Sequence, residues 1–287
     1  MTRRELCVVL IGFTMVPIAP EHSTTISLDP ATSSALILVP VKVDGQGPFS
    51  FIVDTGNAGD IIVTPELAEK LKLRKGSKVK DVYNVGLDTD VSRSTISSVE
   101  LGDIHVGKTK VGISGAISQI AKQLNRPIDG NLGYEFFKKY ALTLDLKQHQ
   151  LTLTEGGEEK DGIDFELVKA MKLITLQVMV NGKPFTFALD TGASFTCVSP
   201  ELVAQLGLIE GAKFKMNNSD QEMATMTKLP LLSVGDKEIM DFSAVSANFL
   251  GVLSERVKFK IDGVLGRNFW SRYLLTIDYP HRKVRFE

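Results

Sequence analysis

The stretch FIVDTGNAGD (residues 51–60) carries the triplet Asp-Thr-Gly directly after an apolar run, and FALDTGASFT (residues 187–196) repeats the arrangement. Aspartate, threonine and glycine all favour turns, so a single triplet of this kind is expected as an ordinary turn at the end of a strand. Two copies after similar apolar runs raise the question of duplication, which the flanking sequence answers.

The two halves of the chain share three blocks of sequence in the same order. The first block is VDGQGPFSFIVDTG (43–56) and VNGKPFTFALDTG (180–192), the second is TPELAEKLKL (64–73) and SPELVAQLGL (199–208), and the third is IDGNLGYEFFKKYALTLDLKQHQLTL (128–153) and IDGVLGRNFWSRYLLTIDYPHRKVRF (261–286). Matches of this length in the same order indicate an internal duplication.

A polar segment separates the two copies. The segment TEGGEEKDGID (residues 154–164) contains glycine and few apolar residues, which is typical of a linker. We therefore predict an N-terminal lobe at residues 24–154, a linker at 155–162 and a C-terminal lobe at 163–287.

Each half has the pattern of a mainly β domain. The predicted strands are residues 36–43, 49–53, 173–180 and 185–189, and hairpins end the halves at 142–153 and 274–286. The segments TPE (64–66) and SPE (199–201) each combine a hydroxyl N-cap, a proline at the first helical position and an acid in the first turn. One short helix is therefore predicted in each half, and FFKKY (136–140) and FWSRY (269–273) could each add one helical turn.

These features together resemble the aspartic peptidases. Each Asp-Thr-Gly follows an apolar strand and precedes an IDGxLG loop, and the resemblance extends over residues 40–287. The short lobes are similar to the retropepsin-like branch, in a bacterial-type form that carries both lobes in one chain. The resemblance implies two homologous retropepsin-like (acid protease) β-barrel lobes, with the active site at the lobe interface.

The resemblance also implies roles for the two triplets. Asp54 and Asp190 are implied to lie side by side as the catalytic pair, without a metal ion or cofactor. The threonine hydroxyls are implied to form hydrogen bonds across the lobe junction, and the glycines permit a close backbone approach. The implied residues of the active-site loops are Thr55, Gly56, Asn57, Thr191, Gly192 and Ala193.

The chemistry of such a pair is acid–base catalysis. Two carboxyl groups at short distance do not both ionise easily, so they share one proton, as is the rule for aspartic proteases. The ionised group takes a proton from a water that attacks the peptide carbonyl, and the protonated group stabilises the oxyanion and protonates the leaving amine. The predicted function is an aspartic endopeptidase acting on a peptide or protein. The alternative is a non-catalytic peptide-binding protein on the same two-lobe fold.

Two positions near the triplets differ from expectation. Asn131 is polar where the family has an aliphatic residue, and Asn57 follows the first triplet where Ala193 follows the second. An amide at Asn57 can donate to the carboxylate of Asp54 and favour its ionised form. We therefore predict that the shared proton favours Asp190.

Hairpin flaps cover the cleft in this family. Residues 81–94 and 214–226 lie where flaps are expected, and Tyr83 is the candidate for the aromatic flap residue.

Composition and motif content argue against several other classes of protein function. A formal net charge of −1 over 287 residues, with 43% hydrophobic residues, does not indicate a nucleic-acid partner. The four histidines are dispersed in sequence and form no local metal motif, and no G-x-S-x-G or H-E-x-x-H is present. Cys197 follows an apolar strand and is interpreted as a small buried residue.

The N-terminus predicts export. Arg3 and Arg4 precede an apolar run at residues 6–19, which is typical of a secretory signal and short for a membrane span. We predict that residues 1–23 are a signal peptide or an anchor, and that the protein is exported to the periplasm or secreted. Association with a membrane is expected only through this segment.

Overall fold

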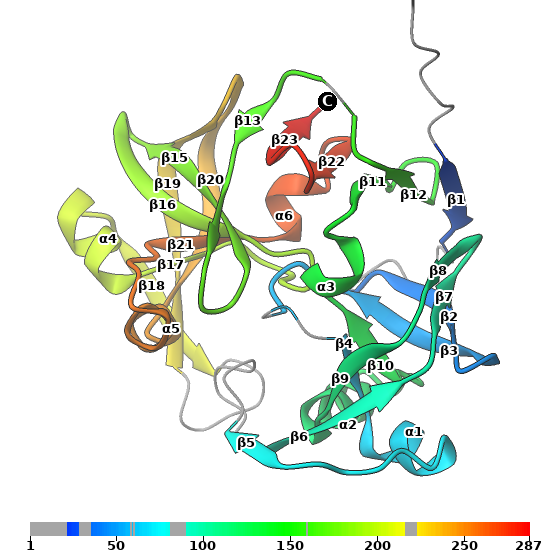
Figure 1. The fold of residues 1–287 in the computed structure, drawn as a ribbon. Helices are drawn as coiled ribbons and strands as arrows, with labels where there is room; N and C mark the ends of the chain where they lie inside the picture. The colour runs from blue at the N-terminus through cyan, green and yellow to red at the C-terminus, as the bar shows by residue number, and fades with distance from the viewer. Residues whose placement is uncertain are drawn as a thin grey trace, which may run out of the picture.

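Three β-sheets form the molecule (Figure 1), which is described by a computed structural model. A nine-stranded sheet comes from the first half of the chain, an eight-stranded sheet from the second, and a six-stranded sheet from both. The structure confirms the predicted mainly β fold with two lobes.

The described residues are 22–28, 36–57, 59, 61–80, 90–158, 160–215 and 223–287. Residues 1–21 of the predicted export segment (residues 1–23) and the flap candidate Tyr83 lie outside them, so both stay predictions. None of the helices within these ranges has the length and apolar character needed to cross a membrane.

The N-terminal lobe is built on the nine-stranded sheet. Its strands are β2 (Leu38–Val43), β3 (Gln46–Val53), β4 (Ile61–Val63), β5 (Lys78–Lys80), β6 (Asp90–Ile96), β7 (Val99–Leu101), β8 (Ile104–Val106), β9 (Thr109–Ile113) and β10 (Gly130–Leu132). Their order is β5-β6-β9-β4-β10-β3-β2-β7-β8. Alternate residues of β2 are buried, as expected for a strand with one face on a core.

The C-terminal lobe repeats this arrangement. Its strands are β14 (Glu166–Val168), β15 (Leu173–Val180), β16 (Lys183–Leu189), β17 (Cys197–Val198), β18 (Glu210–Lys215), β19 (Met223–Val234), β20 (Lys237–Ala247) and β21 (Gly263–Leu265). Their order is β14-β15-β16-β21-β17-β20-β19-β18. From β15 onward, these strands are the equivalents, in turn, of β2, β3, β10, β4, β9, β6 and β5 in the N-terminal lobe. In both lobes the strand that precedes Asp-Thr-Gly pairs in parallel with the strand of the IDGxLG loop.

The six-stranded sheet joins the lobes. Its strands are β1 (Ser23–Ser27), β11 (Tyr140–Asp145), β12 (Gln150–Glu155), β13 (Ile163–Asp164), β22 (Leu275–Asp278) and β23 (Lys283–Phe286), in the order β1-β12-β11-β22-β23-β13. The two predicted C-terminal hairpins meet where β11 pairs with β22. The chain between β12 and β13 crosses from one lobe to the other near this sheet (Figure 1).

Within the described residues, three helices accompany each lobe. They are α1 (Pro65–Lys70), α2 (Gly115–Gln123) and α3 (Tyr134–Phe137), followed by α4 (Pro200–Leu206), α5 (Phe249–Val257) and α6 (Arg267–Trp270). The helices α1 and α4 begin as predicted, with N-cap hydroxyls of Thr64 and Ser199 that accept from Leu67 N and Leu202 N. The sequence does not predict α2 and α5.

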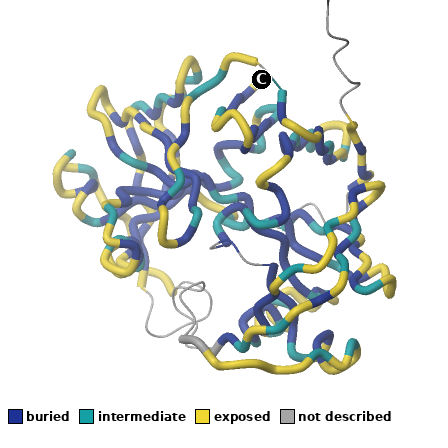
Figure 2. The backbone as a smooth tube through the Cα atoms, in the orientation of Figure 1, coloured by how far each residue is buried: buried dark blue, intermediate teal, exposed yellow. Residues whose placement is uncertain are grey.

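A continuous apolar core fills both lobes. The aromatic rings of Phe51 and Phe187, at equivalent positions in β3 and β16, are fully buried. Burial of a side chain of this size stabilises the fold by about 1.5–3 kcal/mol. The buried backbone concentrates in the middle of each lobe and where the lobes meet (Figure 2), so the Asp-Thr-Gly turns rest on rigid strands.

The duplicated hairpins provide a matched test of stability. Asp278 at the end of β22 is fully buried and accepts from Glu158 N at 2.6 Å, His281 N at 3.1 Å and His281 Nδ1 at 3.1 Å. Its equivalent, Asp145, is half-buried and accepts from two backbone N–H groups of its own turn.

We expect Asp278→Ala to lower the free energy of unfolding by about 2–4 kcal/mol, because buried donors lose a charged acceptor. Asp145→Ala should lower it by about 1 kcal/mol or less, since water can replace the carboxylate. Urea denaturation of both variants measures the difference. Equal losses would show that Asp278 does not tie the interlobe segment to the C-terminal hairpin.

Candidate active site

The two Asp-Thr-Gly turns meet where the lobes join. Asp54 directly follows β3 and Asp190 directly follows β16. Asp54 N donates to Leu132 O at 3.0 Å, and Asp190 N donates to Leu265 O at 3.2 Å. Each aspartate is therefore anchored to the IDGxLG loop of its own lobe.

The threonines lock the two turns to each other. Thr55 Oγ1 donates to Leu189 O at 2.9 Å, and Thr191 Oγ1 donates to Val53 O at 2.8 Å. Each hydroxyl also accepts from the backbone N–H of the other threonine, both at 3.0 Å. Both side chains are buried, so these four reciprocal hydrogen bonds form without competition from water.

The glycines bring each turn against the aspartate of the opposite lobe. A Cβ atom on Gly56 would overlap the carboxyl group of Asp190. A Cβ atom on Gly192 would lie 3.0 Å from Asp54 Cγ, closer than ordinary packing permits. Only glycine lets the two carboxyl groups approach each other from both sides.

The environment of the carboxyl groups shifts their ionisation. Both residues are half-buried, and the surrounding protein desolvates their carboxyl groups. Burial, together with the negative charge of Asp190, raises the pKa of Asp54 to about 8. Burial also raises the pKa of Asp190, although the N–H groups of Gly192 and Ala193 and a hydrogen bond from Asp54 oppose the rise. The two groups titrate as a pair that retains one proton near neutral pH.

The pKa shifts of the pair favour a different position of the shared proton from the one that the sequence predicts. Asp190 Oδ1 accepts from Gly192 N at 2.7 Å, and its carboxylate also interacts with Ala193 N. These donors and the hydrogen bond from Asp54 favour the ionised form of Asp190. The direction of these shifts favours the proton on Asp54, whereas the sequence predicts a preference for Asp190.

Comparison with known proteins gives the same family as this geometry. A sequence model of the family described as aspartyl protease matches residues 39–136 and 176–269, one region in each lobe. The chain belongs to the aspartyl protease family. A search among curated proteins finds no significant match. Membership of this family supports a protease-type function, that of a hydrolase acting on peptide bonds.

The amide that donates to Asp54 in this aspartyl protease family member is that of Asn131. Asn131 Nδ2 donates to Asp54 Oδ2 at 3.1 Å, and Asn57 Nδ2 donates to Asn131 Oδ1 at 2.7 Å. The sequence predicts that the side chain of Asn57 donates to Asp54, but this side chain donates to Asn131, which in turn donates to Asp54. Its backbone N–H interacts with the Asp54 carboxylate instead.

The second aspartate has a support that the sequence does not reveal. Trp270 Nε1, on α6, donates to Asp190 O at 3.2 Å, and the ring is fully buried. Phe137 occupies the equivalent position in α3 and has no donor. The only sequence signal for this contact is the change from FF to FW in the third repeated block.

The aspartates of the IDGxLG loops have a different task. Asp129 Oδ2 accepts from Ser50 N at 2.8 Å, and Asp262 Oδ2 accepts from Thr186 N at 3.0 Å. They attach each loop to the strand beside it and do not join the central pair.

The structure brings most predicted site residues to one place. Those gathered at the junction are Asp54, Thr55, Gly56, Asn57, Asp190, Thr191, Gly192 and Ala193.

Cys197 is buried, and desolvation raises the pKa of its thiol to about 12, which leaves it protonated and unsuited to nucleophilic attack. Within the described ranges, no three His, Cys, Asp or Glu side chains cluster as a metal site.

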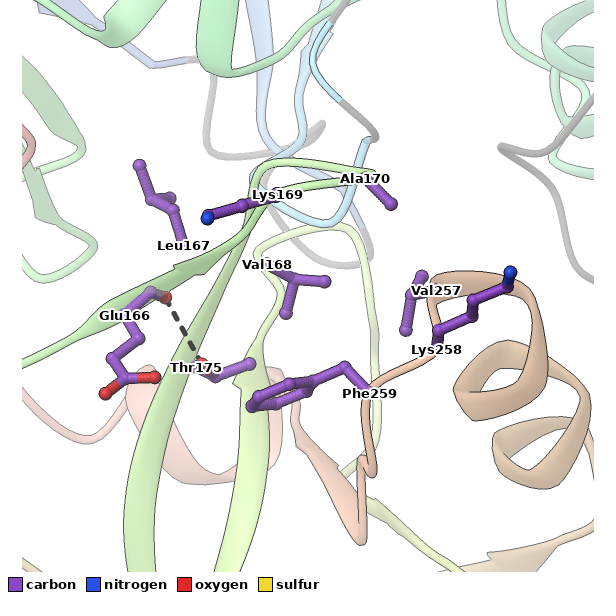
Figure 3. Close-up of a pocket in the computed structure, with 9 residues that line it drawn as sticks. All are labelled: Glu166, Leu167, Val168, Lys169, Ala170, Thr175, Val257, Lys258 and Phe259. Carbon is purple, nitrogen blue, oxygen red and sulfur yellow. Dashed lines mark hydrogen bonds between the residues drawn. The ribbon is translucent and has the colours of Figure 1, made fainter.

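A cavity of about 390 Å³ lies in the C-terminal lobe between the β14–β15 turn and the end of α5 (Figure 3). Val168, Val257 and Phe259 form its apolar wall, with Lys169 and Lys258 beside it. The wall belongs to the apolar cluster that also contains Val264 and contacts Ala193. The cavity is thus connected by packing to the loop of Asp190, but the Asp-Thr-Gly turns do not line it.

The threonine interactions can be tested by stability alone. We expect Thr55→Val to lower the free energy of unfolding by about 2–4 kcal/mol, because Leu189 O and Thr191 N lose their buried partner. Thr55→Ser keeps the hydroxyl and should cost only about 1 kcal/mol for the lost methyl group. Chemical denaturation compares the two variants. Similar losses in both would mean that packing of the methyl group, and not the hydrogen bonds, holds the turns together.

Proposed function

We propose that the protein is an aspartic endopeptidase in which Asp54 and Asp190 activate one water molecule. The observation that supports this most is the close approach of two desolvated carboxyl groups, each on a turn that hydrogen-bonds to the opposite lobe. Such a pair supplies a base and an acid at one place without a metal ion.

The order of events follows from the position of the proton. The ionised Asp190 takes a proton from water while the water oxygen attacks the carbonyl carbon of the scissile bond. The protonated Asp54 donates its proton to the carbonyl oxygen, which gives a neutral tetrahedral diol. When the diol collapses, Asp190 gives its proton to the amine nitrogen, the ionised Asp54 takes a proton from one diol hydroxyl, and the carbon–nitrogen bond breaks. The products are a carboxylic acid and an amine, and the pair returns to its single-proton state.

The substrate is proposed to be an extended peptide or an unfolded protein segment. The hairpins β5–β6 and β18–β19 extend from equivalent places in the two lobes, and residues 81–89 and 216–222 connect their strands. The predicted flaps at residues 81–94 and 214–226 overlap these strands, but residues 81–89 and 216–222 lie outside the described ranges, so the flaps stay a prediction. The placement of the hairpins in both lobes fits a ligand that lies across the junction.

Removal of either carboxyl group tests the assignment of the pair. We expect Asp54→Asn and Asp190→Asn each to reduce peptide cleavage by at least about 10³-fold, because an amide can neither take nor give the proton. Cleavage of a denatured protein or a peptide library by the full chain measures this, with circular dichroism to check the fold. Asp236→Asn is the matched control, since Asp236 is 81% exposed on a turn. Near-full activity in either pair variant would rule out the assignment, and peptide binding without cleavage by the wild type would support the non-catalytic alternative.

The pH dependence tests the state of the pair. The active form holds one proton, so activity needs a pH above the raised pKa of Asp190 and below that of Asp54, which is about 8. We expect the rate to rise above the ordinary aspartate value of about 3.9, to be retained at neutral pH, and to fall as pH rises through about 8. Initial rates from pH 3 to 10 measure both limbs. A cleavage rate that already falls as pH rises from about 5 to 6 would contradict a pair that retains its proton at neutral pH.

A further inference from the structure

A pair of buried amides lies beside Asp54. Asn57 and Asn131 are each 4% exposed. Asn57 Nδ2 donates to Asn131 Oδ1 at 2.7 Å, and Asn131 Nδ2 donates to Asp54 Oδ2 at 3.1 Å. The three side chains come from a turn and a strand that are 74 to 77 residues apart in the chain.

The other lobe has no such pair. The repeated blocks place Ala193 opposite Asn57 and Val264 opposite Asn131. Val264 is buried in an apolar cluster, and Ala193 packs against that cluster. Both members are polar in one lobe and both are apolar in the other. A single polar side chain buried beside Asp54 would leave hydrogen-bonding groups unsatisfied, which explains why the two positions differ together.

The donor and acceptor roles are determined by the surroundings. An amide oxygen facing the carboxyl oxygen Asp54 Oδ2 would be repelled, so the amide nitrogen of Asn131 faces it. The oxygen of Asn131 then points the other way and needs a donor, which Asn57 Nδ2 supplies. Asn57 therefore selects the orientation of the Asn131 amide.

We propose that Asn57 and Asn131 are positioning residues that hold the Asp54 carboxyl in one orientation and keep the shared proton on its oxygen nearest Asp190. A carboxyl oxygen that accepts from Asn131 is a poor place for a proton, because a hydroxyl hydrogen there would point at a donor. The proton is consequently assigned to the other oxygen, Oδ1, which faces the same Gly192 turn as Asp190 Oδ1. This role rests on the proposed function only where it concerns the rate of cleavage.

Few charged groups compete with this interaction. Among the residues that the structure describes, the titratable side chains that interact with Asp54 are Asp190 across the junction and Tyr279 next to the end of β22. Burial raises the pKa of Tyr279 beyond the working range, so its phenol stays neutral. A change in the titration of Asp54 can therefore be attributed to the amides or to Asp190.

The experiment follows the ionisation of Asp54 directly. The full chain is labelled with aspartate that carries ¹³C at the carboxyl carbon, the Asp54 signal is assigned with Asp54→Asn, and its shift is recorded against pH. The variants copy the other lobe: Asn131→Val, Asn57→Ala and both together. Ile128→Val is the control, because Ile128 is a buried apolar residue just before the same strand and carries no hydrogen bond in its side chain.

We expect Asn131→Val to raise the apparent pKa of Asp54 by about one unit, since a donor to its ionised form is lost. Asn57→Ala should raise it by less, and the double variant should match Asn131→Val, because Asn57 acts through Asn131. The alkaline limb of the cleavage profile should move upward by the same amount. Ile128→Val should change stability and leave the titration unaltered.

Three results would overturn the proposal. The first is an apparent pKa of Asp54 in Asn131→Val that stays within about 0.2 units of the wild-type value. The second is a pKa shift in the double variant that equals the sum of the shifts in Asn57→Ala and Asn131→Val. The third is a pKa shift in Ile128→Val as large as that in Asn131→Val. If Asn131→Val fails to fold, Asn57→Ala must still raise the apparent pKa of Asp54, and an unchanged value rejects the proposal. If the wild type cleaves no peptide, the proposed endopeptidase function fails, whereas the carboxyl titration still decides the role of the amides.

Discussion

Four hydrogen bonds join the two lobes at Thr55 and Thr191. They fix the distance between the lobes, and the approach of the two carboxyl groups depends on that distance. Each threonine reaches into the opposite lobe, so neither Asp-Thr-Gly turn has its full set of partners alone. Two carboxyl groups repel when both ionise, and the junction would open if only they met there. The threonine contacts, with the shared sheet behind them, keep the carboxyl groups together, and the proton shared by the pair follows from that enforced contact.

Duplication explains how one chain makes this junction. Equivalent strands carry the two turns, and the β11–β22 pairing makes one sheet from the C-terminal hairpins of both halves. Since both copies are in one chain, the lobes can differ without losing their partner. They do differ behind the aspartates: the backbone of Asp190 receives a donor from Trp270, whereas the side chain of Asp54 receives one from Asn131.

The repeated blocks predict the β lobes and the beginnings of α1 and α4, because each depends on local chemistry or on the duplication, and the resemblance to the aspartic peptidases implies the meeting of Asp54 with Asp190. The helices α2 and α5 are not predicted, for local reasons as well. Ser114 caps α2, but glycine follows where proline and an acid mark α1, and α5 begins without a side-chain cap and contains Gly251. The role of Asn131 depends on a partner distant in sequence. From the sequence alone, Asn131 is a departure from the family pattern, and Asn57 is the nearer donor.

The asymmetry of the pair is the property that the two lobes set jointly. A donor to Asp54 lowers the pKa of that group, yet burial and the charge of Asp190 raise it by more, and the N–H groups around Asp190 favour the charge there. If the amides position the acid as proposed, Asn131 decides which oxygen of Asp54 holds the proton more than whether Asp54 holds it. In the proposed mechanism, backbone donors in one lobe place the charge and side-chain amides in the other orient the acid, so that base and acid face the same water. A symmetric pair would have to break this degeneracy when substrate binds, whereas the proposed pair is already asymmetric in the free protein.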